Sequence, residues 1–456
     1  MIKFNLVNFL LEAKIFRKIG LPILGSQLVM YGMTTTDYIM AGYYSSEDLA
    51  GVGLGASIFN PLYFLTAGVM FGIGPIIAQH FGAKEYDKIK IKTRKFLWVA
   101  LLIGTIFTLI LINTGFILDS LGTSKDIKDI SFGYLSAVAY GTVPMTIYQA
   151  LRNYSEGITQ TKIVFLIGGL GFILNIPLNY LFIFEFGYGG IGCGIATAVI
   201  SWLGLLTIVF ATYSLKQYRQ TRIYGKFILP DFASAKELVV IGVPISFGIF
   251  VELSMFSGAA LIISIFGSTS LAAHTISLNI VGLLFMMPLS LGLASAIRVG
   301  NLIGEKNYQK ANFAANFSLR FSFFIALFNY AILFFAGTIL IGLYTNDATV
   351  IEKAVGLLAL AAIFQIPDAI GFSAMGSLRG HKDTFATMVN LIISYWLFAL
   401  PIGIFLAFSD NNFLPNEAEG IWYGMIIGIT ISAILNTRRL KYKKGSLKNL
   451  YKLRTN

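Results

Sequence analysis

Three acidic side chains lie deep inside long apolar stretches of the sequence, at Asp37, Glu252 and Asp368. A charged side chain at the centre of a bilayer costs at least ~2.5–3.5 kcal/mol on insertion scales, so these acids need a physical reason to be there. Burial favours the neutral form of a carboxyl group, and a bound cation stabilises the ionised form. Either state suits a site that binds and releases a small cation. In the alternative interpretation, each acid hydrogen-bonds neighbouring Thr, Ser or Gln side chains and only holds helices together.

Alkali cations prefer oxygen ligands, and two groups of residues carry them. One group adjoins Asp37, and the other is an asparagine pair further along the chain. Three threonines, residues 34–36, directly precede Asp37. Asn175 and Asn179 are four residues apart and share one face of a helix, with Pro177 loosening the backbone between them. Carboxylate, amide and hydroxyl oxygens are hard ligands that suit such cations. Asn side chains also make ordinary interhelical hydrogen bonds, so the asparagine pair alone does not decide the function.

An aromatic ring accompanies the third acid. Phe364 and Asp368 are four residues apart, which places a ring beside a carboxylate on one helix face. Ring and carboxylate together attract organic cations through cation–π attraction and charge. The three apolar stretches that hold the acids contain no Lys or Arg. We therefore expect the cargo to be cationic.

The elements that carry these residues are long apolar segments. The chain of 456 residues is 56% hydrophobic and 12% charged, whereas a soluble domain is about 45–50% apolar and about 25% charged. This composition excludes a solvated globular enzyme, a disordered chain and a coiled coil. Apolar segments of about 20 residues, the length of a membrane span, predict an all-α membrane protein. Twelve such spans are expected, at residues 19–43, 49–79, 96–118, 131–150, 163–184, 190–214, 238–266, 276–299, 318–343, 354–376, 384–408 and 420–436.

Lys and Arg residues are distributed unevenly between the two sides of these spans. Of the 34 basic residues, all expected in loops or at span ends, 31 fall on the side of the two termini and only Lys125, Lys128 and Lys353 fall on the other. Basic loops remain in the cytoplasm, so both termini are predicted to be cytoplasmic. The net charge of +12 is thus spread over the cytoplasmic loops, which argues against a nucleic-acid partner. The basic tail, residues 438–454, can also bind acidic lipid, although a role in topology is the preferred interpretation.

An internal repeat divides the chain into two halves. Three sequence matches occur at one constant offset of 222 positions: residues 19–22 with 241–244, residues 49–50 with 271–272, and residues 82–88 with 304–310. Each half holds six spans, so both halves enter the membrane in the same direction, as in transporters built from parallel repeats. The predicted organisation is an N-terminal interfacial segment (1–18), an N-lobe (19–214), a cytoplasmic connector (215–237), a C-lobe (238–436) and a basic tail (437–456).

The sequence lacks the signatures of several other classes of chemistry. The single cysteine, Cys193, permits no intramolecular disulfide and no thiolate metal cluster. The sequence contains no phosphate-binding Gly-x-x-x-x-Gly-Lys-Ser/Thr loop and no His-Glu-x-x-His zinc helix. The Gly-x-Gly-Asp motif of intramembrane aspartyl proteases is also missing. We therefore expect neither an enzyme nor a resident cofactor, and we expect the first span to be a retained helix rather than a cleavable signal peptide.

Short motifs throughout the chain resemble those of multidrug and toxic compound extrusion (MATE) transporters, most closely the bacterial NorM-like branch. The first is Thr36-Asp37-Tyr38-Ile39-Met40-Ala41-Gly42, followed by residues 48–53. Further matches are found at residues 155–157, 175–180, 190–198, 272–274, 287–290, 298–300 and 376–380, together with Glu252 and Asp368. The similarity extends from about residue 15 to 436.

The resemblance implies a secondary active antiporter that exports organic cations and drugs in exchange for Na⁺ or H⁺ by alternating access. It implies cation-binding or coupling residues at Asp37, Asn175, Asn179 and Thr197 in the N-lobe and at Glu252 and Asp368 in the C-lobe, with Na⁺ bound at one of these two sets. Candidates for the substrate path are Gln27, Tyr38, Phe364 and Gln365. Phe364 stands where some relatives carry Tyr, Pro367 directly precedes Asp368, and Thr275 follows His274 where Gln is frequent.

The expected location is the bacterial inner membrane, where the chain acts as a monomer surrounded by lipid. The alternative function is a flippase or exporter of lipid-linked or amphipathic metabolites in the same wider superfamily. A flippase for anionic headgroups would need intramembrane Lys or Arg, and the apolar spans provide none.

Overall fold

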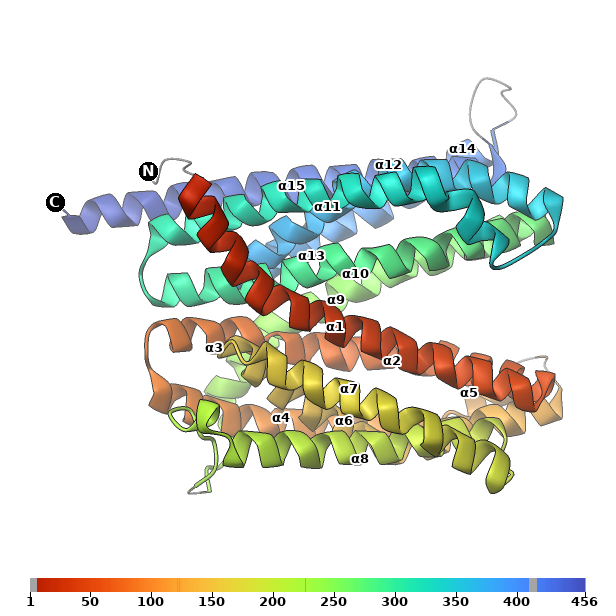
Figure 1. The fold of residues 1–456 in the computed structure, drawn as a ribbon, viewed down its shortest axis with the longest axis horizontal. Coiled ribbons are helices and arrows are strands. Elements are labelled where there is room, and N and C mark those ends of the chain that lie inside the picture. Colours follow the sequence, from red (N-terminus) through yellow and green to blue (C-terminus); the bar gives the residue numbers. More distant parts are fainter. Residues whose placement is uncertain (1–5, 121, 123, 226, 410–415, 456) are drawn as a thin grey trace. The chain divides into compact units, whose positions relative to one another are not determined.

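The computed structural model describes residues 6–120, 122, 124–225, 227–409 and 416–455, with side chains as far as residue 445, and this part of the chain is helical with no strand. Figure 1 shows the helices as a ribbon. The first half contains α1 (Leu6–Tyr44), α2 (Ser46–Phe71), α3 (Ile73–Gly82), α4 (Tyr86–Ile112), α5 (Gly115–Asp119), α6 (Lys125–Gly157), α7 (Thr161–Tyr180), the π-helix η1 (Leu181–Glu185), α8 (Gly190–Ser214) and the 3₁₀ turn η2 (Lys216–Tyr218). The second half contains α9 (Phe232–Ile263), the 3₁₀ turn η3 (Ser264–Phe266), α10 (Ser268–Gly304), α11 (Tyr308–Gly342), α12 (Ala348–Gly380), α13 (Thr384–Ile392), the π-helix η4 (Ile393–Ala399), α14 (Leu400–Ala407) and α15 (Glu417–Thr455).

The predicted spans correspond to these helices. Within the described residues, 10 helical stretches are long and apolar enough to cross a membrane. The other two expected spans lie in α1 and α6, which contain 39 and 33 residues but carry more polar side chains. The prediction of an all-α membrane protein is confirmed.

The internal repeat is visible in the helix boundaries. The stretch formed by α2 and α3 runs from Ser46 to Gly82, and α10 runs from Ser268 to Gly304, 222 positions later at both ends. Helices α4 and α11 begin at Tyr86 and Tyr308, again 222 positions apart. Similar sequence segments therefore form equivalent helices in the two halves.

The described chain forms two compact units, which we call the N-unit (residues 25–246) and the C-unit (residues 1–24 with 247–456). Both boundaries fall within a helix, two residues after Pro22 in α1 and two residues after Pro244 in α9. Residues 6–18, part of the expected interfacial segment, are the first turns of α1, while residues 1–5 lie outside the described residues. The predicted lobe boundaries remain a prediction.

One central helix organises each unit. In the N-unit, α6 packs against α2, α4 and α8. In the C-unit, the equivalent helix α12 packs against α10, α11 and α15. Glycines allow close contact: a Cβ atom at Gly141 of α6 would lie 2.8 Å from the Cα of Ala198 in α8, and one at Gly376 of α12 would lie 2.0 Å from the carbonyl oxygen of Gly292 in α10.

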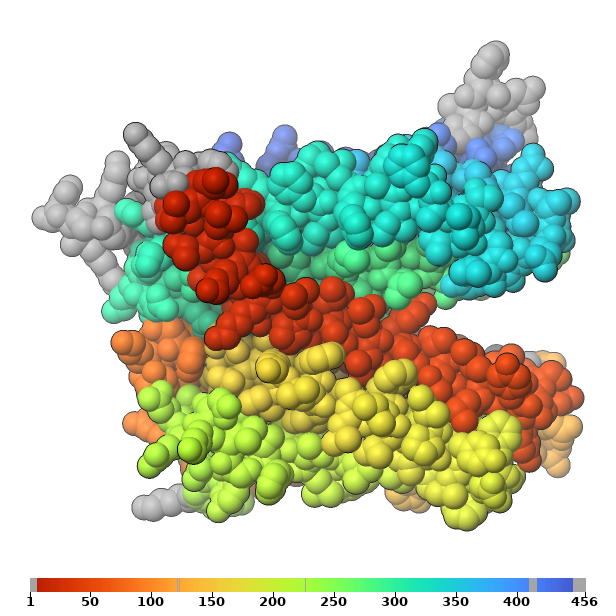
Figure 2. Space-filling view, viewed as in Figure 1, coloured from red at the N-terminus to blue at the C-terminus, as the bar shows by residue number. Residues whose placement is uncertain are grey.

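Helix α7, yellow in Figure 2, has an outer face that is apolar and is left exposed in the described chain. Leu166, Leu170, Ile173 and Ile176 are large apolar side chains, and all four are exposed. Exposing such an apolar surface to water is unfavourable in free energy, whereas contact with the hydrocarbon of a bilayer is not. The exposed face of α7 is therefore suited to contact with lipid.

Candidate functional site

Asp37 on α1 accepts hydrogen bonds from two asparagines on α7. Its Oδ1 atom accepts a hydrogen bond from Nδ2 of Asn179 at 2.6 Å and another from Nδ2 of Asn175 at 3.1 Å. Because the asparagines are four residues apart, both side chains reach the same carboxylate. The structure thus brings together three of the four residues predicted for the N-lobe site.

The asparagine side chains are positioned to offer further oxygen atoms. Asn175 and Asn179 are 1% and 0% exposed, and within the described chain neither Oδ1 atom has a hydrogen-bond partner. A buried amide oxygen without a donor is costly unless something electropositive occupies the space beside it. Two such oxygens, on the amides whose nitrogens contact Asp37, are of the ligand type that an alkali cation takes together with a carboxylate.

The α8 side of this site is defined by Cys193. Its buried Sγ atom lies 3.5 Å from the backbone oxygen of Asp37, which brings α8 close to α1. Thr197 is one helical turn further along α8, on the same face as Cys193. The backbone oxygen of Thr197 accepts a hydrogen bond from Ser201 at 2.7 Å, and the role of Thr197 at this site stays a prediction.

The three threonines before Asp37 do not bond to its carboxylate. Each hydroxyl donates to the backbone oxygen four residues earlier, with Thr35 to Tyr31 and Thr36 to Gly32 both at 2.9 Å. Threonines inside helices commonly satisfy their hydroxyl groups in this way. The expectation of hydroxyl oxygens beside the carboxylate is thus not supported by these hydrogen bonds.

The C-unit acids lie in a different environment. Asp368 on α12 is 5% exposed, and its Oδ2 atom has no hydrogen-bond partner in the described part of the chain. Glu252 on α9 interacts electrostatically with Asp368 and also with Arg379 of α12. The structure therefore groups the two predicted C-lobe acids and adds a guanidinium, which the sequence-based site did not include.

The C-unit candidates for the substrate path are packed in the core. The Phe364 ring lies 6.3 Å from that of Phe256 and 6.2 Å from that of Trp422. Gln365 is fully buried, and its Oε1 atom accepts a hydrogen bond of 3.0 Å from Asn329 of α11. Neither side chain faces solvent in this structure.

Gln27 belongs to a buried charged cluster that the sequence interpretation missed. Arg152 on α6 donates from Nε to Glu156 at 2.9 Å, from one terminal nitrogen to Gln27 at 2.8 Å, and from the other to the sulfur of Met30 at 3.0 Å. Arg152 and Glu156 are only 3% and 5% exposed. Tyr38, the remaining candidate, is partly buried against the apolar cluster of the N-unit.

The Arg152–Glu156 pair corrects the sequence-based charge count, which assigned Arg152 to a basic loop. The residue lies inside α6, five residues before the helix ends at Gly157. A helical spacing of four between Arg and Glu is the signal that could have revealed the pair. Because the guanidinium of Arg152 already donates hydrogen bonds to Glu156 and Gln27, it is not free to bind an anionic headgroup.

Comparison with known proteins agrees with this architecture. The MatE family model matches residues 22–181 and, a second time, residues 244–405, so one model describes both halves of the repeat. The chain belongs to the MatE family. The MATE resemblance found in the sequence is thereby confirmed, and the chain is a multi-pass membrane transporter rather than an enzyme.

Relatives cover almost the whole chain of this MatE protein. It is 34% identical over 427 residues to the multidrug resistance protein NorM of Aliivibrio fischeri, covering 93% of both chains. It is 35% identical over 436 residues to NorM of Vibrio cholerae, covering 94% of this chain and 95% of the relative.

Solved structures share the fold of this MatE protein at lower sequence identity. The crystal structure of the eukaryotic MATE transporter AtDTX14 superimposes with a TM-score of 0.87 at 20% identity, covering 97% of this chain and 99% of the other. An outward-facing multidrug resistance MATE family transporter gives a TM-score of 0.88 at 20% identity, covering 96% and 97%.

Proposed function

We propose that this MatE protein is a secondary active multidrug efflux transporter that exports organic cations in exchange for Na⁺ or H⁺. The observation that carries the proposal is the contact of Asp37 with Asn175 and Asn179, because it joins a carboxylate to two amides whose nitrogens hold it in place and whose buried oxygens have no partner of their own within the described chain. The relatives named multidrug resistance protein support efflux of varied drugs.

Asp37 has two states in the proposed cycle. Ionised Asp37 binds the incoming cation together with the Oδ1 atoms of Asn175 and Asn179, or it takes up a proton. Occupation changes the free energy of one conformation relative to the other, as any coupling between two ligands requires. The exported cation then binds in one conformation and leaves from the other.

The buried C-unit acids are the second candidate for coupling. Glu252 and Asp368 repel each other when both are ionised, so a cation or a proton between them stabilises the pair. Arg379 partly offsets this repulsion. Either unit, or both, can hold the coupling ion under this proposal.

The proposed orientation has both termini in the cytoplasm of a bacterial inner membrane, with the protein acting as a monomer. The distribution of 31 of 34 basic residues on one side supports it. The alternative function, a flippase of lipid-linked precursors, has less support because Arg152 is paired with Glu156.

The decisive experiment uses purified protein in liposomes loaded with ethidium. Export is followed under an imposed Na⁺ gradient and, separately, under an imposed pH gradient. We expect one gradient to drive ethidium export. Asp37→Asn should abolish this gradient-driven export at unchanged protein content. Glu47→Gln is the matched control, because Glu47 is an exposed acid of the same unit at the start of α2. Driven export that is unchanged in Asp37→Asn, Glu252→Gln and Asp368→Asn would overturn the assignment of the coupling sites.

A further inference from the structure

The connector (residues 215–237), which follows α8 and ends in the first turns of α9, is held firmly against α4. Trp98 of α4 donates from Nε1 to the backbone oxygen of Ile228 at 3.0 Å. Arg94 of α4 donates from Nε to the backbone oxygen of Ile223. Two backbone oxygens five residues apart are therefore fixed by side chains of one helix, which gives the connector a defined position.

Buried side chains hold the inner face of the connector. Tyr218 and Thr221 are 0% and 2% exposed. Tyr154 of α6 donates to the backbone oxygen of Thr221 at 2.8 Å, and its ring lies 6.0 Å from that of Tyr218. The connector thus has an inner face committed to its own unit and an outer face that remains available.

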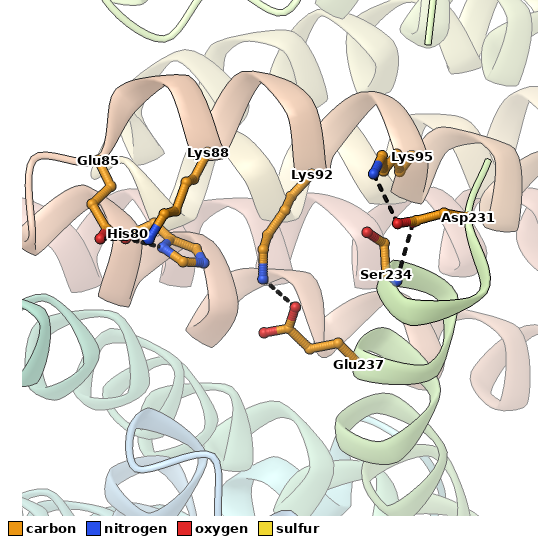
Figure 3. Close-up of polar contacts among 8 residues, drawn as sticks. All are labelled: His80, Glu85, Lys88, Lys92, Lys95, Asp231, Ser234 and Glu237. Carbon is orange, nitrogen blue, oxygen red and sulfur yellow. Dashed lines mark hydrogen bonds and ion pairs between the residues drawn. The ribbon is translucent and has the colours of Figure 1, made fainter. Parts of the chain in front are cut away.

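The two acids of the connector region are paired with α4. Lys95 contacts the carboxylate of Asp231 at 2.9 Å, and Lys92 pairs with Glu237 in the first turns of α9. Figure 3 shows both lysines reaching from α4 to these carboxylates. The backbone N–H of Ser234 also donates to Asp231 at 3.1 Å. Hydrogen bonds with Ser234 and Lys95 lower the pKa of Asp231 to about 2, so this acid stays ionised and internally compensated.

Large apolar side chains project from the outer face. Phe227, Leu229 and Phe232 are 76%, 70% and 83% exposed, although they follow one another within six residues. The ring of Phe227 stands edge-on to that of Trp98, with centroids 5.7 Å apart. Indole rings are favoured where a bilayer meets water, so Trp98 indicates the level of the interface.

Positive charge accompanies these apolar side chains. Residues 215–237 contain five basic and two acidic residues. Since α4 pairs with both acids, these acids do not neutralise the exposed bases of this segment. Of the described bases, Lys216, Arg219 and Lys236 are exposed. We call these three together with Phe227, Leu229 and Phe232 the connector patch.

We propose that the connector patch docks onto the adjacent bilayer surface and binds anionic phospholipid. Phe227, Leu229 and Phe232 enter the boundary between headgroups and acyl chains, and the basic residues contact lipid phosphates. Apolar side chains flanked by cations are the features by which interfacial segments bind such membranes. The connector joins two membrane-spanning helices, so this surface is always within reach, whereas a soluble partner would have to be recruited. The inference does not depend on the cargo or on the coupling ion.

A fluorescent reporter on the full-length protein tests this docking. Leu229→Cys is labelled with an environment-sensitive maleimide; wild-type protein is the labelling blank because Cys193 is buried. The protein is reconstituted with phosphatidylcholine alone or mixed with phosphatidylglycerol. Nitroxide-labelled lipid should quench the reporter, and aqueous iodide should not. Ala83→Cys is the matched control, because Ala83 is exposed in the loop between α3 and α4 of the same unit; iodide should quench it freely.

The charge contribution is tested separately. Phosphatidylglycerol should increase the lipid quenching at position 229, and the variant K216Q/R219Q/K236Q should lose that increase while keeping the basal shielding. Iodide quenching at position 229 equal to that at position 83, in either lipid, would overturn the proposal. Shielding that appears in detergent and grows with protein concentration would also overturn it, in favour of a second copy of the chain. Elution of each labelled variant as a single folded species, with an unchanged melting temperature, excludes misfolding as the cause of either result.

Discussion

Asn179 of α7 donates a hydrogen bond of 2.6 Å to the carboxylate of Asp37 in α1, although 142 positions separate them. The carboxylate also accepts a hydrogen bond from Asn175, which lies one turn earlier on α7. The spacing of the pair was visible in the sequence, and the MATE resemblance grouped the pair with Asp37. The hydrogen bonds themselves required the packing of α1 beside α7.

Replacing Asn179 with Ala should weaken the coupling-ion site. A hydrogen bond to a charged group contributes about 1.5–3 kcal/mol, so the ion concentration for half-maximal transport should rise by at least about tenfold. The measurement is ethidium export from proteoliposomes as a function of the ion that drives it. Asn113→Ala is the control, since Asn113 caps α4 in the same unit and bonds to the backbone of Leu109. An unchanged ion dependence in Asn179→Ala would count against the site.

Replacing Arg152 with Met should destabilise the N-unit. The change leaves Glu156 buried without its partner, which costs about 3–5 kcal/mol. The apparent melting temperature of the detergent-solubilised protein should fall markedly, and the double variant R152M/E156Q should recover part of the loss.

Lys88→Met provides the control for that experiment. Lys88 pairs with Glu85 at 2.7 Å, but their side chains are 59% and 35% exposed. Water screens such a pair, so its removal should cost only about 0–1 kcal/mol. Equal effects of Arg152→Met and Lys88→Met would contradict the role assigned to burial.

Replacing Gly376 with Ala should force α12 away from α10. The added Cβ atom would lie 2.0 Å from the backbone oxygen of Gly292, and backbone cannot move aside as a flexible side chain can. Overpacking of this kind typically costs about 1–3 kcal/mol. Gly282→Ala in α10 is the matched control, because nothing lies within 4 Å of its added Cβ atom. Thermal unfolding of the two variants should differ clearly, and the prediction fails if they melt together.

The anchoring of the connector through Asp231 should not respond to moderate pH changes. The pKa of Asp231 is about 2 in the folded protein, below the unfolded value of about 3.9. The stabilisation is thus present above about pH 4 and is lost only as the pH falls towards 2. Hydrogen exchange of residues 227–237, corrected for the intrinsic rate, should stay constant between about pH 5 and pH 9. Asp231→Asn should raise the exchange at every pH, whereas loosening of the wild-type connector near neutral pH would contradict the assignment.

The sequence by itself determined the class of protein and its internal repeat. Apolar segments of span length predict helices because a bilayer leaves backbone groups no other hydrogen-bond partners. The constant offset of 222 positions also anticipated the equivalent boundaries of α10 and of α2 with α3. Such features depend on local composition and on comparison of the chain with itself, and need no knowledge of packing.

Only the tertiary structure decided which hydrogen bonds the polar groups make. Threonines 34–36 adjoin Asp37 in sequence but bond to their own helix, while distant asparagines reach its carboxylate. Arg152 was counted as a loop residue, yet α6 buries it between Glu156 and Gln27. Hydropathy reports how apolar a segment is, but it does not say which face of a helix turns towards which neighbour. That choice arises from close packing between helices far apart in the chain, as at Gly376 and Gly292.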